Sequence, residues 1–381
     1  MRLAFALYKY FPYGGLQRDF AAFVSELLGR GHDCRVYTNS WQGEQLPGID
    51  LRLAPPSAGS NVRRNRRFLE WVRAGLAAEP ADGLIGFNKM PGLDIYYAGD
   101  PCFLDKALQE RGFIYRLGWR FRHFAAWERK VFDPAGSTEI LLLSASEARK
   151  FDRHYHTPAA RMHLLPPGVA VDRRRPPDAL ARRAQSRRAL GLGQDVLALL
   201  FVGSGFVTKG LDRAIRALAG LRAAHPDFKL HLLVAGQDRA DRFALLARRQ
   251  QVADAVSFLG GRDDIGDLLL AADVLVHPAR SEAAGIALLE ALVAGLPVVT
   301  NSVCGYAHHV EAAGAGLVLP EPFEQGALED ALARMLRSEF RAACRDRGLA
   351  YAEREDLYSL HRTGADLIER FVRRKQGNGN D

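Results

Sequence analysis

Two glutamates, Glu282 and Glu290, lie eight positions apart in the largely apolar stretch 280–290. A buried carboxylate is costly unless a partner satisfies it. The flanking segments Val274–His277 and 298–300 are typical of buried strands, so both carboxylates are expected near the carboxyl end of a strand, where open α/β sheets bind ligands. An ordinary packing helix with one exposed and one snorkelling glutamate would give the same local pattern. Other parts of the chain must therefore distinguish a ligand-binding pair of carboxylates from a packing helix.

A glycine-rich loop, residues 203–210, follows the apolar run 196–202 and places Lys209 at the start of a predicted helix. A lysine at a helix N-terminus suits a pyrophosphate, although a surface lysine would fit the same pattern. The spacing is not that of a Walker loop, which disfavours nucleotide triphosphate hydrolysis. Because lysine neutralises phosphate and carboxylates accept hydrogen bonds from hydroxyls, Lys209 together with Glu282 and Glu290 suits a nucleotide sugar.

A second glycine pair, Gly14-Gly15, follows the first predicted strand and precedes a predicted amphipathic helix at 16–29. Glycine lets backbone N–H groups approach a ligand closely because it has no Cβ. A plain turn has the same sequence, so the pair is weak evidence alone. It lacks the Gly-x-Gly-x-x-Gly spacing, which disfavours a nicotinamide enzyme.

Short apolar strands alternate with helices along most of the chain, a pattern typical of parallel sheets covered on both faces. We predict an α/β fold with two doubly wound, Rossmann-like domains, 1–168 and 169–355, facing a central cleft, and a helix at about 356–376 that packs back on the first domain. The expected strands are 3–7, 34–38, 49–53, 84–87, 95–98, 140–143, 196–202, 229–235, 256–259, 274–277 and 298–300.

The composition is that of a soluble globular protein, with 381 residues, 48% apolar and 25% charged. The net charge of +8 favours an anionic partner: a nucleotide sugar, a phosphorylated acceptor, a membrane surface or nucleic acid. Four scattered cysteines predict neither a zinc site nor a disulfide framework and fit a reducing, cytoplasmic compartment. No apolar run approaches the length of a transmembrane helix.

Four segments together resemble one enzyme family: the Lys209 loop, the opening residues 7–19, the motif 86–94, and the stretch from His277 to Glu290. They are similar to the lipopolysaccharide core glucosyltransferase I family of retaining, GT-B glycosyltransferases. The resemblance spans nearly the whole chain. It implies transfer of a hexose from a UDP donor to an inner-core heptose in an alpha linkage, and similarity to this family implies that the hexose is glucose. It also implies no cofactor, and since the chain has no Asp-x-Asp motif, no metal is expected.

The resemblance implies roles for the donor-binding residues of the second domain. Glu282 would meet hydroxyls of the donor sugar, and Glu290 would meet the ribose hydroxyls of UDP. The backbone at Ala284 and Gly285 would lie along the sugar, and Lys209 would hold the pyrophosphate. The reaction would retain configuration by front-face attack, since no carboxylate nucleophile is evident, and stabilising the charge on the departing UDP would be the main catalytic contribution.

Other residues carry weaker implications from the same resemblance. Gly15 would approach the pyrophosphate from the first domain, and Arg262 would hold the uracil unless it is an ordinary surface arginine. Asp100 and Asp19 would lie near the reacting sugar and the acceptor, although a strand-end cap and an exposed helix charge are the ordinary alternatives. Thr208 stands where the family usually has an arginine beside the lysine, so the phosphate clamp would be weaker or completed by another arginine.

The segment 112–132 is dense in aromatic residues and arginine and is predicted to form one long helix. A helical wheel puts seven apolar residues on one arc, and this face is expected to pack on the core: Phe113, Ile114, Leu117, Phe121, Phe124, Val131 and Phe132. The remaining basic face, with Trp119, would suit an anionic leaflet and hence peripheral association with the inner face of the cytoplasmic membrane. The residues assigned to the acceptor or membrane are Arg63, Arg64, Lys89, Arg116, Trp119, Arg120 and Arg122.

Three alternatives remain open at this stage. A UDP-sugar 2-epimerase on the same architecture would release UDP without an acceptor. A glycogen phosphorylase would need a lysine-bound pyridoxal cofactor. A basic nucleic-acid-binding protein is supported by charge alone, without a recognised motif. The donor hexose is also open between glucose, galactose and an N-acetylhexosamine.

Overall fold

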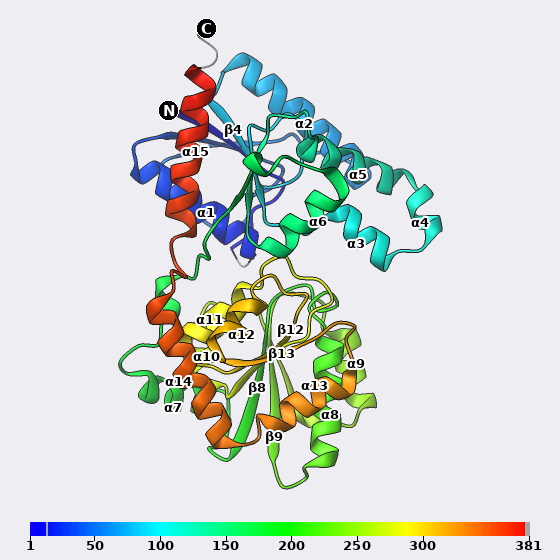
Figure 1. The fold of residues 1–381 in the computed structure, drawn as a ribbon, viewed down its shortest axis with the longest axis vertical. Helices are drawn as coiled ribbons and strands as arrows, with labels where there is room; N and C mark the ends of the chain where they lie inside the picture. Colours follow the sequence, from blue (N-terminus) through cyan, green and yellow to red (C-terminus); the bar gives the residue numbers. More distant parts are fainter. Residues whose placement is uncertain (13, 378–381) are drawn as a thin grey trace. The chain divides into compact units, whose positions relative to one another are not determined.

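The computed structural model describes residues 1–12 and 14–377. Tyr13, within the first glycine loop, lies outside the described residues. The chain divides into two compact units (Figure 1): unit 1 comprises residues 1–166 and 359–381, and unit 2 comprises residues 167–358. No helix in the described part of the chain is both long enough and apolar enough to cross a bilayer.

Unit 1 is built on a parallel sheet. Its strands are β1 (Arg2–Leu7), β2 (Asp33–Thr38), β3 (Ile49–Leu53), β4 (Gly83–Gly86), β5 (Ile95–Ala98), β6 (Glu139–Leu142) and β7 (Met162–Leu164). Their order in the described residues is β3-β2-β1-β4-β5-β6-β7. Because the order reverses between β1 and β4, the carboxyl ends of these two strands form a switch point of the kind at which doubly wound sheets bind ligands.

Helices cover both faces of this sheet. They are α1 (Gly15–Gly29), α2 (Asn61–Ala78), α3 (Phe103–Glu110), α4 (Phe113–Leu117), α5 (Trp119–Phe132), α6 (Ala145–Tyr155) and α15 (Leu360–Gly377). The C-terminal helix α15 lies against α1 (Figure 1), and Arg30, the C-cap residue of α1, forms an ion pair of 2.6 Å with Asp366. The last helix therefore completes the first unit rather than the second.

Unit 2 has a second parallel sheet. Its strands are β8 (Val196–Val202), β9 (Lys229–Ala235), β10 (Val256–Gly260), β11 (Val274–His277), β12 (Val298–Asn301) and β13 (Gly316–Leu319). In the described residues their order is β10-β9-β8-β11-β12-β13, so the switch point lies between β8 and β11. The helices are α7 (Ala179–Ala189), α8 (Leu211–Ala224), α9 (Asp241–Arg249), α10 (Ile265–Ala271), α11 (Ile286–Ala294), α12 (Ala307–Ala313), α13 (Gln325–Arg334) and α14 (Ser338–Arg354).

Strand β8 shows why this sheet is buried on both faces. Leu199 and Phe201 point into one apolar cluster with α8 and α13, whereas Ala198 and Leu200 point into another with α10 and α11. Since successive side chains of a strand alternate between faces, a continuous apolar run is what a doubly covered strand requires. The fold class predicted from the alternating pattern is confirmed.

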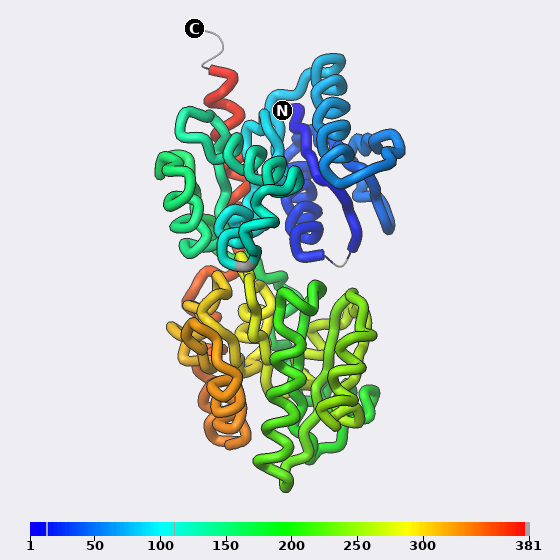
Figure 2. Tube along the Cα trace, turned by 90° about the vertical axis from the view of Figure 1, so that its right-hand side faces the viewer, coloured from blue at the N-terminus to red at the C-terminus, as the bar shows by residue number. Residues whose placement is uncertain are grey.

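The predicted single helix over 112–132 is wrong. The chain breaks at Gly118, whose backbone is extended (φ −71°, ψ 147°), and forms the separate helices α4 and α5. The apolar side chains of α4 do not pack on the core, because Phe113 is 71% exposed and Ile114 is 84% exposed. Helices α3 to α5, cyan to teal, face the viewer in Figure 2.

Candidate active site

The loop between β8 and α8 holds Lys209 over the end of the sheet. Gly203 has a φ of 128°, and a Cβ placed there would lie 2.7 Å from the Lys209 Cδ. Gly210 has a φ of 76°, and its Cβ would lie 2.0 Å from the carbonyl oxygen of Pro278. Both positions therefore require glycine, which lets the loop pack closely against the segment that follows β11.

The segment between β11 and α11 presents Glu282 at the adjacent strand end. Its backbone pairs with Cys304, and the Glu282 carbonyl accepts from the N–H of Gly305 at 3.3 Å. The Ala284 carbonyl accepts from the N–H of Tyr306 at 2.7 Å. Gly285 follows in the left-handed region (φ 89°) as the N-cap of α11, so the loop enters the helix through a turn that favours glycine.

Lys209 and Glu282 meet in an ion pair between the Lys209 Nζ and the Glu282 Oε2. His277 Nε2 lies 3.5 Å from the same oxygen, at the limit of a hydrogen bond. Burial alone would raise the pKa of Glu282, but Lys209 and His277 outweigh it and lower that pKa to about 2. Burial lowers the pKa of His277. The site therefore presents an ionised carboxylate and an ammonium group at the switch point of the second sheet.

Glu290 lies apart from this pair, on α11, and only 3% of the residue is exposed. Its Oε1 is 3.6 Å from the Nε of Arg173. The two glutamates thus have different environments, one beside an ammonium group in a loop and the other beside a guanidinium group in a helix. The sequence assigned no role to Arg173 or to His277, because their relevance depends on contacts between segments far apart in the chain.

Arg280 is the arginine in contact with Thr208. Its backbone N–H donates to the Thr208 carbonyl at 2.7 Å, and its guanidinium forms two hydrogen bonds of 2.8 Å with the carboxylate of Asp212. It also donates to the carbonyl of Val207 at 2.9 Å. Arg280 therefore ties the lysine loop to the glutamate loop, a role that its position in the sequence did not reveal.

Arg262 lies at the carboxyl end of β10, at the edge of the same sheet. It donates to both carboxylate oxygens of Asp264, with 2.7 Å for the Nε contact, and its side chain is 38% exposed. Hydrogen bonds connect the loops that follow β10, β9 and β8. The Gly236 N–H donates to the Gly260 carbonyl at 2.8 Å, and the Gln237 N–H donates to Ser204 Oγ at 3.1 Å. Arg262 is thus on the same edge of the sheet as Lys209, two strands away.

In unit 1, Gly14 and Gly15 begin α1 at the switch point of the first sheet. A Cβ on Gly14 would lie 1.9 Å from the Gln17 Oε1, so this position cannot accept a larger residue without movement of Gln17. Among the described residues other than its two chain neighbours, no atom lies within 4 Å of a Cβ placed on Gly15. Close packing therefore explains Gly14, whereas the space beside Gly15 is open to a ligand.

Asp19 is engaged within unit 1. Tyr97 Oη donates to one of its oxygens at 2.7 Å, and His361 Nε2 lies 3.1 Å from the other. His361 belongs to α15, so Asp19 joins the sheet and the C-terminal helix through α1. Asp100, by contrast, has an exposed side chain just beyond β5, at the carboxyl edge of the sheet.

Lys89 is not a surface lysine. Its side chain is 12% exposed and pairs at 2.6 Å with Glu128, which is fully buried. The same ammonium group donates to the carbonyl of Pro101 at 2.7 Å. The glutamate that interrupts the apolar side of α5 therefore has a partner, and the assignment of Lys89 to an acceptor-facing surface is replaced by this internal contact.

The other basic residues assigned to the acceptor or membrane are at the surface. Arg63 and Arg64 are exposed in the first turn of α2, which follows the carboxyl end of β3. Arg120 and Arg122 are exposed on α5, whereas Arg116 is half-buried and donates to the Leu108 carbonyl at 2.7 Å. Trp119 is also on this surface and is 59% exposed.

Comparison with known proteins gives the family. Residues 13–173 match the Glycosyltransferase Family 4 model, and residues 182–350 match the model of Glycosyl transferases group 1. The chain is 45% identical to the lipopolysaccharide glucosyltransferase WaaG of Escherichia coli K12, over 97% of this chain and 98% of that protein.

Solved structures give the same result. A crystal structure of WaaG, described as a glycosyltransferase involved in lipopolysaccharide biosynthesis, superposes with a TM-score of 0.92 at 44% identity, covering 96% of this chain and 99% of WaaG. Anabaena HepE in complex with UDP-glucose shares the fold, with a TM-score of 0.75 at 15% identity over 97% of this chain and 99% of HepE. The two parallel sheets, the Lys209 loop with its glutamate partner and the full-length similarity agree: this chain belongs to the family of the lipopolysaccharide glucosyltransferase WaaG and is a GT-B glycosyltransferase.

Proposed function

We propose that this enzyme transfers glucose from UDP-glucose to a heptose of the lipopolysaccharide inner core, forming an alpha linkage with retention of configuration. The full-length similarity to WaaG supports the class of donor and acceptor. The ion pair between Lys209 and Glu282 at the β8–β11 switch point is the observation on which the proposal rests.

The donor would exchange this ion pair for two contacts of its own. Lys209 would turn to the pyrophosphate, and Glu282 would accept hydrogen bonds from sugar hydroxyls, which charged acceptors bind more strongly than neutral ones do. Glu290 would bind the ribose, Arg262 the uracil, and the backbone at Ala284 and Gly285 would follow the sugar. Gly15 of unit 1 would approach the pyrophosphate.

The reaction would break the bond between the anomeric carbon and the UDP oxygen while the acceptor oxygen bonds to the same face of that carbon. The acceptor proton would pass to the departing phosphate. Negative charge grows on UDP during this step, so a fixed ammonium group at that position would lower the barrier. Asp100, exposed at the carboxyl edge of the unit 1 sheet, would lie near the acceptor.

UDP release measured over a panel of UDP-glucose, UDP-galactose and UDP-N-acetylglucosamine, with and without a heptose-containing core acceptor, tests the assignment. We expect fast release only with UDP-glucose and acceptor together, and the same rate in the presence of a metal chelator. UDP release at the same rate with and without acceptor would support the 2-epimerase alternative instead. Faster release from another UDP-sugar would identify that sugar, rather than glucose, as the donor.

The proposed acceptor is carried by a membrane lipid, and unit 1 has a surface suited to it. Four large apolar residues of α4 and α5 have exposed side chains: Phe113, Ile114, Leu117 and Trp119. Together with the neighbouring arginines, we call them the α4–α5 surface. A cluster of large apolar side chains exposed to solvent is typical of an interaction site. Because Arg120 and Arg122 flank them, we propose peripheral binding to anionic lipid on the cytoplasmic side.

Reversing three charges on this surface should abolish binding to anionic liposomes. Each basic residue near such a membrane contributes about 1 kcal/mol, so Arg116→Glu, Arg120→Glu and Arg122→Glu together should weaken binding by more than 100-fold in a flotation assay. The matched control reverses three exposed arginines of unit 2: Arg239, Arg248 and Arg249. Flotation unchanged by the first set, or lost equally with the control set, would contradict the proposal.

A further inference from the structure

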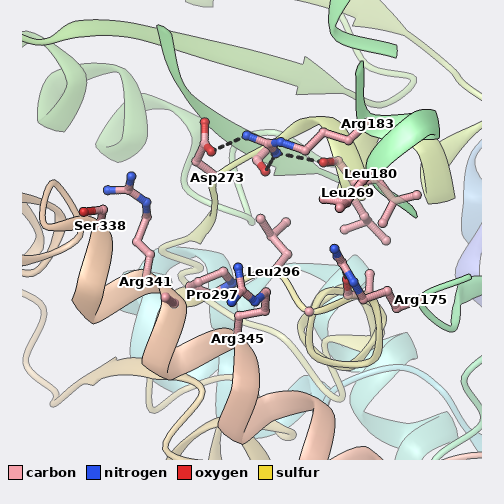
Figure 3. Close-up of a pocket in the computed structure, with 15 residues that line it drawn as sticks. Arg175, Leu180, Arg183, Leu269, Asp273, Leu296, Pro297, Ser338, Arg341 and Arg345 are labelled. Carbon is pink, nitrogen blue, oxygen red and sulfur yellow. Dashed lines mark hydrogen bonds and ion pairs between the residues drawn. The ribbon is translucent and has the colours of Figure 1, made fainter. Parts of the chain in front are cut away.

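A cavity of about 340 Å³ lies in unit 2 at the amino ends of two strands (Figure 3). Asp273 directly precedes β11, and Pro297 directly precedes β12. Lys209 and Glu282 follow strands β8 and β11, so they lie at the carboxyl ends, on the opposite edge of the sheet. The cavity is therefore separate from the proposed donor site.

Positive charge dominates the lining of this cavity. Asp273 is the one carboxylate among the described residues that line it, and it is already bonded to Arg183 at 2.6 Å, to Arg187 at 3.2 Å and to the N–H of Ala198 at 2.8 Å. Four arginines contribute to the wall, from the segment before α7, from α7 itself and from α14: Arg175, Arg183, Arg341 and Arg345.

Three of these arginines bond to carbonyl groups, and Arg183 donates to those of Leu270, Ala271 and Ala272. Arg175 donates to Ala294 at 3.3 Å and Arg341 donates to Met335, and no ion pair within 4 Å joins either one to a carboxylate in the described part of the chain. Burial and then the charges of Arg345 and Arg183 lower the pKa of Arg175. Like charges held together in a half-buried site repel one another, and this repulsion is relieved when an anion binds between them.

We propose that this cavity binds a small phosphorylated anion. The planar guanidinium group offers paired N–H donors that match phosphate oxygens, and several such groups around one cavity favour a dianion over a carboxylate. The cavity is of the size that small ligands occupy. Its floor is apolar, with Leu269 and Leu296 both buried, and would pack against the organic part of a phosphomonoester.

The cavity also adjoins the C-terminal end of α11, the helix that begins directly after the segment with Glu282 and Gly285. The backbone N–H of Arg175 donates to the Val293 carbonyl at 3.0 Å, next to the Ala294 carbonyl that its guanidinium binds. An anion that draws the Arg175 side chain into the cavity would therefore compete with a contact at the end of this helix.

Calorimetric titration with inorganic phosphate, at ionic strength held constant with chloride, tests the proposal on the intact protein. We expect saturable binding that weakens at least tenfold in Arg341→Gln and in Arg345→Gln. Arg345 is the milder site, since its side chain bonds to the exposed Asp346, so its variant should keep the fold, as circular dichroism would show. Arg239→Gln, an exposed arginine on the same unit, should bind phosphate as the parent does.

Lys209→Ala separates the two phosphate-binding regions. Because Lys209 is on the opposite edge of the sheet, phosphate binding to the cavity should survive this substitution. Binding lost in Lys209→Ala and retained in both arginine variants would place the phosphate at the donor site and overturn the proposal. Absence of saturable binding in the parent protein would overturn it as well.

Discussion

Replacing Lys209 by alanine should lower kcat/KM for UDP-glucose by on the order of 100- to 1000-fold. Removing one group that stabilises developing negative charge costs about 3–4 kcal/mol of transition-state stabilisation, and Lys209 would be the charged group nearest the leaving phosphate. The loss also leaves Glu282 without its counter-ion beside an anionic donor. The pKa of Glu282 is lowered to about 2, and the charge of Lys209 is the largest cause of that lowering. Without Lys209, the pKa of Glu282 should rise toward its ordinary value.

The measurement is a steady-state assay of UDP release with Lys229→Ala as the matched control. Lys229 is an exposed lysine of the same unit, 72% exposed and paired with Asp195 on the surface, so its removal should leave turnover unchanged. Lys209→Arg should keep part of the activity, because it keeps the charge but not the compact ammonium geometry. Turnover near wild type in Lys209→Ala would show that leaving-group stabilisation lies elsewhere.

The central strands of unit 2 were predictable because they are largely apolar runs and are mostly buried. The expected runs at Val196–Val202, Lys229–Ala235 and Val274–His277 have the bounds seen in the structure. Strand β13 was not predicted; it is four residues long, and three of them are only half-buried. Helix α14 was missed as well: its buried residues, Cys344, Gly348 and Tyr351, lie at helical spacing, but they do not make the strongly apolar face by which an amphipathic helix is recognised.

The pairing of candidate site residues was only partly predictable. Glycines on both sides of Lys209 and the position of Glu282 after a strand indicated which loops form the candidate site. The strand order that brings these two loops together, and the contact of Arg280 with Thr208, come from tertiary structure alone. The burial of Lys89 was not predictable either, because the motif 86–94 does not indicate whether the ammonium group is exposed.

The helical wheel of 112–132 failed for a different reason. Periodicity shows which residues share a face, but not whether that face meets the core or the surface. A glycine in the middle of the segment was the available signal for a break, since glycine is a poor helix former. Once the helix ends at Gly118, the apolar side chains of α4 lie beyond the core and become exposed.

Replacing Glu128 by alanine should destabilise unit 1 by about 3–5 kcal/mol, the cost of removing one partner of a buried ion pair. Both of its oxygens are engaged, because Lys89 Nζ lies 2.6 Å away, Tyr155 Oη donates at 2.6 Å, and the first N–H groups of α3 donate from Phe103 at 2.7 Å and Leu104 at 2.9 Å. The substitution removes the acceptor of all of these donors, and Lys89 keeps only its hydrogen bond to the Pro101 carbonyl. Urea unfolding, followed by circular dichroism, measures the loss.

The pH dependence of stability has a definite sign. Burial alone would raise the pKa of Glu128, but the charge of Lys89 outweighs it and the pKa is lowered. A carboxylate with a lowered pKa contributes its full stability above the pKa of the unfolded chain and loses it as the pH falls through the folded value. The parent protein should therefore lose stability in acid more steeply than Glu128→Gln does. Glu70→Ala, an exposed glutamate on α2, should match the parent at every pH.

A double substitution separates the charge of this network from its packing. In Lys89→Met with Glu128→Leu, no buried charge is left without a counter-ion, so the protein should recover much of the stability lost in Glu128→Ala. The N–H groups of Phe103 and Leu104 would still lack an acceptor, and each buried unsatisfied donor costs about 1–3 kcal/mol. We therefore expect the double variant to fall between the parent and Glu128→Ala. A double variant that only equals Glu128→Ala in stability would show that capping of α3, rather than neutralisation of Lys89, is the main contribution of this glutamate.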